Sequence, residues 1–253
     1  MTEKEKKADA VATVDHTYPA LANPNVCALI EQTVEVMGIT PWQLGQIRVP
    51  TGGNLAWTID TGNGPDACKE FSGIIGLAKA KQRAWYRESF SDTGGGSPPS
   101  CTSADGRNGF GVNDPNSPPD THPTSYSCAS CEWNQFGSKR GPGRGKDCAE
   151  VMHLYIWLPG EALPAVLQVP PTSLQAVQGY MLKLASKFQM PQSVMTRFGL
   201  KIRSGKGVPD SSTLVLSIER LLTEEEQQNM GRIADTMKAL VPFLYPSVSP
   251  DVM

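Results

Sequence analysis

Residues 151–169 read VMHLYIWLPGEALPAVLQV, in which two apolar runs are separated by a turn that contains proline and glycine. Apolar runs of about four to eight residues that end at turn residues are typical of strands buried in a sheet. The sequence therefore predicts strands over 151–158 and 165–169. The rest of the fold is placed around these two strands.

The chain after these strands adds two helices and two more strands. Apolar periodicity predicts a helix over 172–188, strands over 194–202 and 213–218, and a last helix that opens at Thr223, where Glu226 completes a capping box. Short strands with one helix before the last pair predict an α+β fold that is mainly β. Within that class they favour an OB-type five-stranded Greek-key barrel with flanking helices. Other α+β sheets also fit this order of elements.

The chain before residue 91 adds a helix and a hairpin. Asn23-Pro24 is a favourable helix start and Gly38 lies just beyond the last residue of the apolar periodicity, which predicts one helix between them. Alternating runs over 44–49 and 55–59, joined by Thr-Gly-Gly-Asn, predict a β-hairpin.

Domain boundaries follow from where this pattern starts and stops. We expect a disordered tail over 1–22, one OB-like domain over 23–220, and a C-terminal helix and tail over 221–253. The domain contains an insertion at about 91–150 that has no periodicity and is rich in glycine and proline. A segment of that length without a core of its own needs an organiser, and a bound metal ion is the usual one.

Composition limits the class of protein. The 253 residues include 39% hydrophobic residues, 24 glycines and 21 prolines, which favours long loops and short strands over a helix bundle. No apolar run reaches the roughly 18 residues that a membrane span needs, and the charged start MTEKEKKADA lacks the apolar core of a signal peptide. We therefore expect a cytoplasmic, non-secreted protein with no membrane partner. In that compartment six cysteines indicate metal binding or free thiols rather than disulfides.

The predicted insertion contains a metal-binding pattern. Cys128-Ala-Ser-Cys131 places two thiolates on one turn, and Cys148 follows at the spacing of the second half of a zinc ribbon. These three cysteines predict one structural zinc ion with a fourth ligand from elsewhere. The candidates for that ligand are Cys101, His122 and His153. Cys101 is the first choice because four-thiolate sites are common for structural zinc. The alternative is a set of unrelated thiols in a reducing compartment.

A first group of cations precedes the insertion. Residues 71–210 carry 15 basic and 10 acidic side chains, although the whole chain has a formal net charge of −2. On a strand, five alternating residues would share one face: Lys79, Lys81, Arg83, Trp85 and Arg87. Such a face suits a nucleic-acid strand, because cations contact phosphates while a ring stacks on a base. The alternative is a strand whose Trp85 packs in the core and whose cations are solvated.

Further cations and aromatic rings extend this pattern. The loop between Cys131 and Cys148 contains Phe136, Lys139, Arg140, Arg144 and Lys146. A third group, Arg197, Lys201 and Arg203, has the parity of one strand face. Trp57 is a second candidate, and Phe136 a third, for stacking on bases. A solvated surface is the alternative for both groups of cations.

Four segments carry a resemblance to a known family. They read PPSCTSADG at 98–106, CASCEWNQFGS at 128–138, GRGKDC at 143–148 and LQVPPTSL at 167–174. Together they resemble a family of zinc-containing single-stranded DNA-binding proteins encoded by bacteriophages and related mobile elements, over about residues 70–200. The resemblance implies an OB-type fold with a zinc-stabilised insertion. It also implies that Cys101, Cys128, Cys131 and Cys148 are the zinc ligands.

These patterns lead to one expected function and two alternatives. We expect a non-catalytic single-stranded DNA-binding protein of a replication or recombination module, acting in the cytoplasm of a bacterial host, with replication or recombination proteins as further partners. Only three histidines are present and no serine, histidine and carboxylate arrangement can be picked out, so an enzyme is not expected. The first alternative is a regulatory protein that binds a host protein through its zinc loop. The second is a metal-dependent nuclease, which would need a carboxylate cluster.

Overall fold

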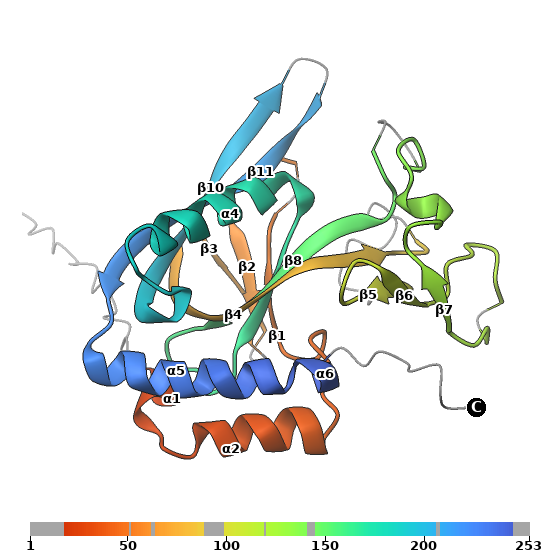
Figure 1. Cartoon of the computed structure of the whole chain (residues 1–253). Coiled ribbons are helices and arrows are strands. Elements are labelled where there is room, and N and C mark those ends of the chain that lie inside the picture. Colours follow the sequence, from red (N-terminus) through yellow and green to blue (C-terminus); the bar gives the residue numbers. More distant parts are fainter. Residues whose placement is uncertain are drawn as a thin grey trace, which may run out of the picture.

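One sheet forms the body of the molecule, with helices on two of its sides (Figure 1). The computed structural model describes residues 18–50, 52–61, 64–88, 99–118, 120–140, 145–205 and 208–244. The strands in these ranges are β1 (Gly45–Arg48), β2 (Trp57–Asp60), β3 (Pro65–Cys68), β4 (Phe71–Trp85), β5 (Cys101–Ser103), β6 (Asn108–Gly111), β7 (Thr124–Ser127), β8 (Ala149–Trp157), β9 (Ala165–Val169), β10 (Val194–Gly205) and β11 (Val208–Leu221). The helices are α1 (Pro19–Ala22), α2 (Val26–Glu31), α4 (Pro171–Ala185), α5 (Glu224–Ala239) and α6 (Val241–Leu244), with a π-helical turn η1 (Gln32–Val36) and 3₁₀ turns η2 (Glu132–Asn134) and η3 (Pro191–Ser193).

The sheet is open. Its order is β3-β2-β1-β9-β8-β4-β5-β6-β7, and β10 joins it through β4 while β11 pairs with β10. Among the described strands, β1 and β9 form the only parallel pair. The predicted α+β class, mainly β, is confirmed, but the closed five-stranded barrel is wrong. The physical reason lies in β4, whose 15 residues pair with β10 at one end, β8 along the middle and β5 at the other end, so the sheet branches instead of closing.

Most of the predicted elements are present. The strands predicted over 151–158 and 165–169 are confirmed as β8 and β9, and the hairpin as β1 and β2. The helix before Gly38 is confirmed as α2 and η1, and Gly38 has the positive φ, 65°, that a helix end favours. The predicted N-terminal tail is too long, because Tyr18 is buried and α1 follows it. Residues 1–17 lie outside the described residues.

Two apolar clusters form the core, one on each face of the sheet. Strand β8 is buried on both: Leu154 and Ile156 belong to the cluster under α4, whereas Tyr155 and Trp157 belong to the cluster under α5. Helix α5 lies close to the sheet because Gly76 leaves room for it. A Cβ atom at Gly76 would stand 2.4 Å from the Trp157 ring and 2.6 Å from Met230 of α5. No helix in the described part of the chain is long and apolar enough to cross a membrane.

The start of α5 has the predicted capping box. The Glu226 N–H donates to Thr223 Oγ1 over 3.3 Å, and the Thr223 N–H donates to Glu226 Oε2 over 2.8 Å. Arg220 donates two further bonds of 2.8 Å to the Glu226 carboxylate. These bonds, chiefly those from Arg220, lower the pKa of Glu226 from 4.5 to about 2. At pH values above its unfolded-state pKa, the Glu226 carboxylate therefore stabilises the fold. This stabilisation is lost as the pH falls through the folded-state pKa.

We expect Thr223→Ala to cost about 1 kcal/mol of unfolding free energy, because one N–H of the first turn loses its acceptor. Glu226→Gln should remove part of the acid sensitivity between pH 4.5 and about 2. Urea unfolding at several pH values measures both effects. Glu224→Gln, an exposed acid of the same first turn, is the matched control. Equal behaviour of Glu224→Gln and Glu226→Gln would mean that the helix dipole, not the cap, sets the pH dependence.

Candidate functional site

A separate lobe extends from the end of β4, away from the helices (Figure 1). We call the described residues between 99 and 148 the cysteine lobe; it contains β5, β6, β7 and η2. The insertion predicted without periodicity therefore has short strands, which continue the sheet because β5 pairs with Arg83–Trp85 of β4. Neither apolar cluster of the core includes a residue of this lobe. Something other than an apolar core must hold it.

Four cysteines line one small cavity in the lobe: Cys101, Cys128, Cys131 and Cys148. The cavity measures about 20 Å³, which is room for one body the size of a water molecule. Gly109 allows two of the sulfurs to approach, since a Cβ atom there would stand 3.2 Å from Cys101 Sγ and 3.5 Å from Cys128 Sγ. Neither His122, which is exposed, nor His153, which is buried against Trp42, is among the lining residues.

The lobe backbone places these cysteines. The Cys128 N–H donates to the Arg107 carbonyl over 2.7 Å, and the Cys148 N–H donates to the Trp133 carbonyl over 2.8 Å. The buried Asn134 side chain donates to the Cys128 carbonyl over 2.6 Å. Hydrogen bonds to neighbouring segments of the lobe therefore fix the backbone at Cys128 and Cys148.

The cavity suits zinc in its donor set. Burial raises the pKa of Cys101 to about 12 and that of Cys148 to about 11, because a thiolate is poorly solvated there. A bound cation reverses this effect and holds thiols as thiolates. As they stand, however, the described side chains form no group of three or more His, Cys, Asp or Glu that could hold a metal ion. Zinc at this cavity therefore stays a prediction, supported by the convergence of four soft donors.

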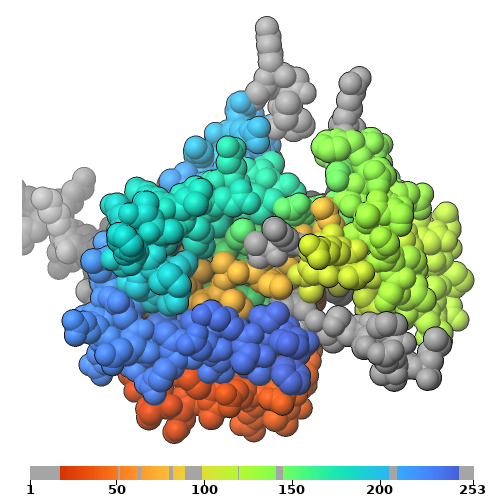
Figure 2. Space-filling view, in the orientation of Figure 1, coloured from red at the N-terminus to blue at the C-terminus, as the bar shows by residue number. Residues whose placement is uncertain are grey.

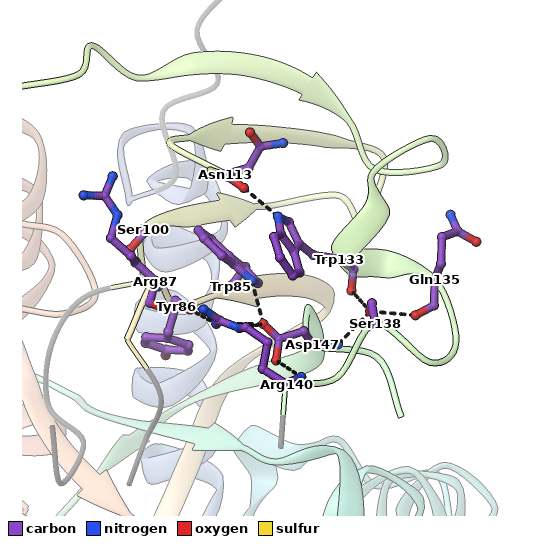
Figure 3. Close-up of polar contacts among 10 residues, drawn as sticks. All are labelled: Trp85, Tyr86, Arg87, Ser100, Asn113, Trp133, Gln135, Ser138, Arg140 and Asp147. Carbon is purple, nitrogen blue, oxygen red and sulfur yellow. Dashed lines mark hydrogen bonds and ion pairs between the residues drawn. The ribbon is translucent and has the colours of Figure 1, made fainter. Parts of the chain in front are cut away.

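A stack of three side chains joins the lobe to β4 (Figure 3). The Trp85 and Trp133 rings stack with centroids 5.3 Å apart. The Arg140 guanidinium lies 5.1 Å from the first centroid and 5.3 Å from the second. Arg140 also contacts the Asp147 carboxylate, with Nε 2.7 Å from Oδ2, and donates to the Tyr86 and Arg87 carbonyls over 2.5 Å and 2.6 Å. Trp85 Nε1 donates to the same carboxylate over 2.8 Å.

This stack corrects two predicted nucleic-acid contacts. Trp85 is only 1% exposed, so its ring faces are not available to a base, and Arg140 is committed to Asp147 and two carbonyls. Trp57 is also wrong as a stacking ring, since it is 0% exposed and packs edge-on against Phe71 with centroids 5.1 Å apart. The alternative stated for Trp85, a ring packed in the interior, is the one the structure supports.

The other described cations in β4 and just after it are partly buried. Arg83 forms an ion pair of 3.6 Å with Glu150 and donates to the Gly106 carbonyl over 3.3 Å. Arg87 donates to the Ser117 carbonyl over 3.2 Å. Lys79 is half-buried, and the Lys81 side chain lies outside the described part. A register shift between Lys79 and Gln82 also ends the simple alternation, so the predicted single cationic face is wrong.

The outer loop of the lobe has an exposed ring next to cations. Phe136 is 83% exposed, and the Lys146 ammonium lies 5.4 Å from its ring centroid. Lys139 is exposed, and its N–H donates to the Gly145 carbonyl over 3.2 Å, which closes the loop. Lys146 also donates to Asn134 Oδ1 over 3.2 Å. Arg144 lies outside the described residues.

The third predicted group lies on the arm formed by β10 and β11. The β10–β11 register is regular from Thr196 to Arg203, so Arg197, Lys201 and Arg203 share one face. Arg197 is held by Glu219 in an ion pair of 3.6 Å, whereas Lys201 and Arg203 are exposed and form no ion pair or side-chain hydrogen bond with the described residues. Figure 2 shows a hollow between this arm and the cysteine lobe.

Two features of this region were missed by sequence reasoning. Asp147 accepts the bonds that fix Arg140. The sequence contained a sign of this role, because Asp147 is the only carboxylate among four cations between Trp133 and Cys148. Phe188 is 98% exposed, which makes it a more accessible ring than Trp57 or Trp85. No signal in the helix periodicity pointed to it.

Comparison of the chain with protein-family models, with curated proteins and with solved structures finds no match. The resemblance to phage single-stranded DNA-binding proteins therefore stays a prediction. Any functional assignment rests on the chemistry of the lobe and the arm.

Proposed function

We propose that the protein binds single-stranded DNA without catalysis, and that one structural zinc ion on Cys101, Cys128, Cys131 and Cys148 organises its cysteine lobe. In this proposal it belongs with the phage and mobile-element proteins that its cysteine segments resemble. The sheet is then an opened and enlarged form of an OB-type barrel. Replication or recombination proteins are its further partners.

The observation that carries the proposal is the exposed ring of Phe136 with Lys146 beside it. A bare phenyl ring on a loop closed by backbone hydrogen bonds is a surface on which a base can stack. In this proposal Lys139, which is exposed, and Lys146, which lies beside the ring, contact the phosphates next to that base. The ring buries little in its own chain, so it contributes little to the stability of the lobe.

The arm carries a second set of exposed cations. Lys201 and Arg203 lie on one face of β10 and are exposed. The outer half of the arm is tied to the β1–β2 turn, because Ser212 Oγ donates to the Asn54 carbonyl over 2.6 Å. A flexible single strand can follow both sets of cations, whereas a duplex keeps its bases stacked and away from Phe136.

We expect the wild-type protein to bind a labelled oligo-dT strand more tightly than a duplex of the same length, with an affinity that falls as salt rises. Phe136→Ala should weaken the single-strand complex by roughly tenfold to a hundredfold and leave the salt slope unchanged, because stacking is worth about 1–3 kcal/mol per base. Lys201→Gln should lower the slope by roughly 0.7. Anisotropy titrations at several salt concentrations measure these effects.

Lys238→Gln is the matched control, because this lysine of α5 is exposed and pairs with Asp235 on a helix remote from the hollow. It should change neither affinity nor slope. A wild-type protein that binds neither DNA form at low salt would remove the proposal and leave the lobe as a docking site for a host protein.

A further inference from the structure

Phe188 occupies an unusual backbone position at the end of α4. Its φ is 55°, the only positive value at a non-glycine residue among the described residues. The Phe188 N–H donates to the Ala185 carbonyl and the Gln189 N–H to the Leu184 carbonyl, each over 3.0 Å. This pair of bonds is the Schellman motif, in which the left-handed residue is usually glycine.

A phenylalanine at that position has a conformational cost that packing of its ring against the described residues does not offset. The left-handed conformation disfavours a side chain with a Cβ atom by about 1–2 kcal/mol. A buried ring would recover this through packing, but Phe188 is 98% exposed. Strained residues that persist without packing are concentrated at binding sites. The ring is therefore held out from the surface by a fixed turn.

Two exposed cations lie near the ring in sequence. Lys183 is in the last turn of α4 and Lys187 directly precedes Phe188, and neither side chain forms an ion pair or hydrogen bond within the described part of the chain. From Ala162 to Pro209 the sequence contains no aspartate or glutamate, and it contains six cations: Lys183, Lys187, Arg197, Lys201, Arg203 and Lys206. Of the described cations, Lys183 and Lys187 are the two nearest Phe188 in sequence, and they give this end of α4 a positive charge that suits an anionic ligand.

We propose that Phe188 is a second stacking platform for single-stranded nucleic acid, with Lys183 and Lys187 contacting the phosphates next to the stacked base. This inference rests on the proposed function and names a contact surface for it away from the cysteine lobe. The 15 residues of α4 separate its two ends by about 22 Å, and the end that bears Phe188 points away from the lobe in Figure 1. A bound strand therefore follows α4 from the hollow to Phe188.

The key variant is Phe188→Gly, because folding and binding should change in opposite directions. Glycine relieves the left-handed strain, so the urea midpoint should rise. Loss of the ring should weaken oligo-dT binding by tenfold or more, with an unchanged salt slope. The paired substitution Lys183→Gln and Lys187→Gln should instead lower the slope. Phe188→Trp should keep the affinity and add tryptophan emission that oligo-dT quenches.

Phe188→Leu separates stacking from apolar docking, since it keeps an apolar side chain in the same strained turn but has no flat ring. Binding of the leucine variant at wild-type strength overturns the proposal and favours an apolar protein partner, to which the neighbouring exposed Leu182 and Met190 would contribute. If Phe188→Gly binds oligo-dT with wild-type affinity while Phe136→Ala binds it more weakly, this inference is overturned and the proposed function is not. A wild-type protein that binds no single strand removes both proposals.

Discussion

Removal of zinc is expected to unfold the cysteine lobe while the sheet and its helices stay folded. The lobe contributes no residue to either apolar cluster, so in our proposal a zinc ion supplies free energy that a core would otherwise supply. Structural zinc binding is worth about 10–16 kcal/mol in small zinc domains. Metal analysis should find about one zinc per chain, and a chelator should make the lobe sensitive to protease.

Cysteine variants identify the ligands in the same assay. Cys131→Ser and Cys101→Ser should lose zinc and loosen the lobe, since both thiols line the cavity. Cys27→Ser and Cys68→Ser are the matched controls and should keep the metal, because neither lies in the lobe. His122→Ala should also keep it. A chelated protein whose lobe stays resistant to protease contradicts the zinc assignment, and zinc loss from a His153→Gln protein would move the fourth ligand to that histidine.

Arg140→Met should have the second largest effect. The substitution keeps an apolar stem beside the two stacked tryptophan rings but leaves the Asp147 carboxylate, which is only 12% exposed, without its ionic partner. Removing one member of a mostly buried pair costs about 3–5 kcal/mol, and the 33% exposure of Arg140 places this case near the lower end. The carbonyls of Tyr86 and Arg87 also lose their donor. We expect the lobe to separate from β4 at lower urea than the sheet unfolds.

Limited proteolysis and tryptophan fluorescence follow this separation, because Trp85 and Trp133 lie in the stack. The double variant Arg140→Met with Asp147→Asn should lose less stability than Arg140→Met alone, since no unpaired charge remains. Lys139→Met, an exposed neighbour, is the control and should behave as wild type. A lobe that stays docked in Arg140→Met would mean that the β4–β5 pairing alone holds it.

Local sequence patterns predicted the helices and strands well, because the interactions that form these elements involve residues close together in the sequence. The capping box at Thr223, the turn before β2 and the apolar run of β8 each show their structure in their own sequence. The branching of the sheet could not be predicted in this way. It depends on pairings such as Phe71 with Phe198, which are set by the whole fold rather than by neighbouring residues.

The candidate site was predicted unevenly for the same reason. The spacing of Cys128 and Cys131 is a local signal, and both line the cavity with two more distant cysteines. The role of Trp85 could not be inferred from alternation, because the residue that covers it, Arg140, lies 55 positions later. Alternation assigns a side chain to a face of a strand. It does not say whether another segment covers that face.

The close approach of α5 to Gly76 has a consequence for the order in which the nascent chain can fold. The face of the sheet that carries Ile74, Tyr155 and Trp157 is covered by Met230, Ile233 and Met237, which are synthesised after all the described strands. Until α5 docks, a broad apolar surface on this face is open to other chains. Contacts of such long sequence separation fold slowly and expose chains to aggregation. Yield in rapid expression should therefore depend on chaperones that shield this surface until α5 docks.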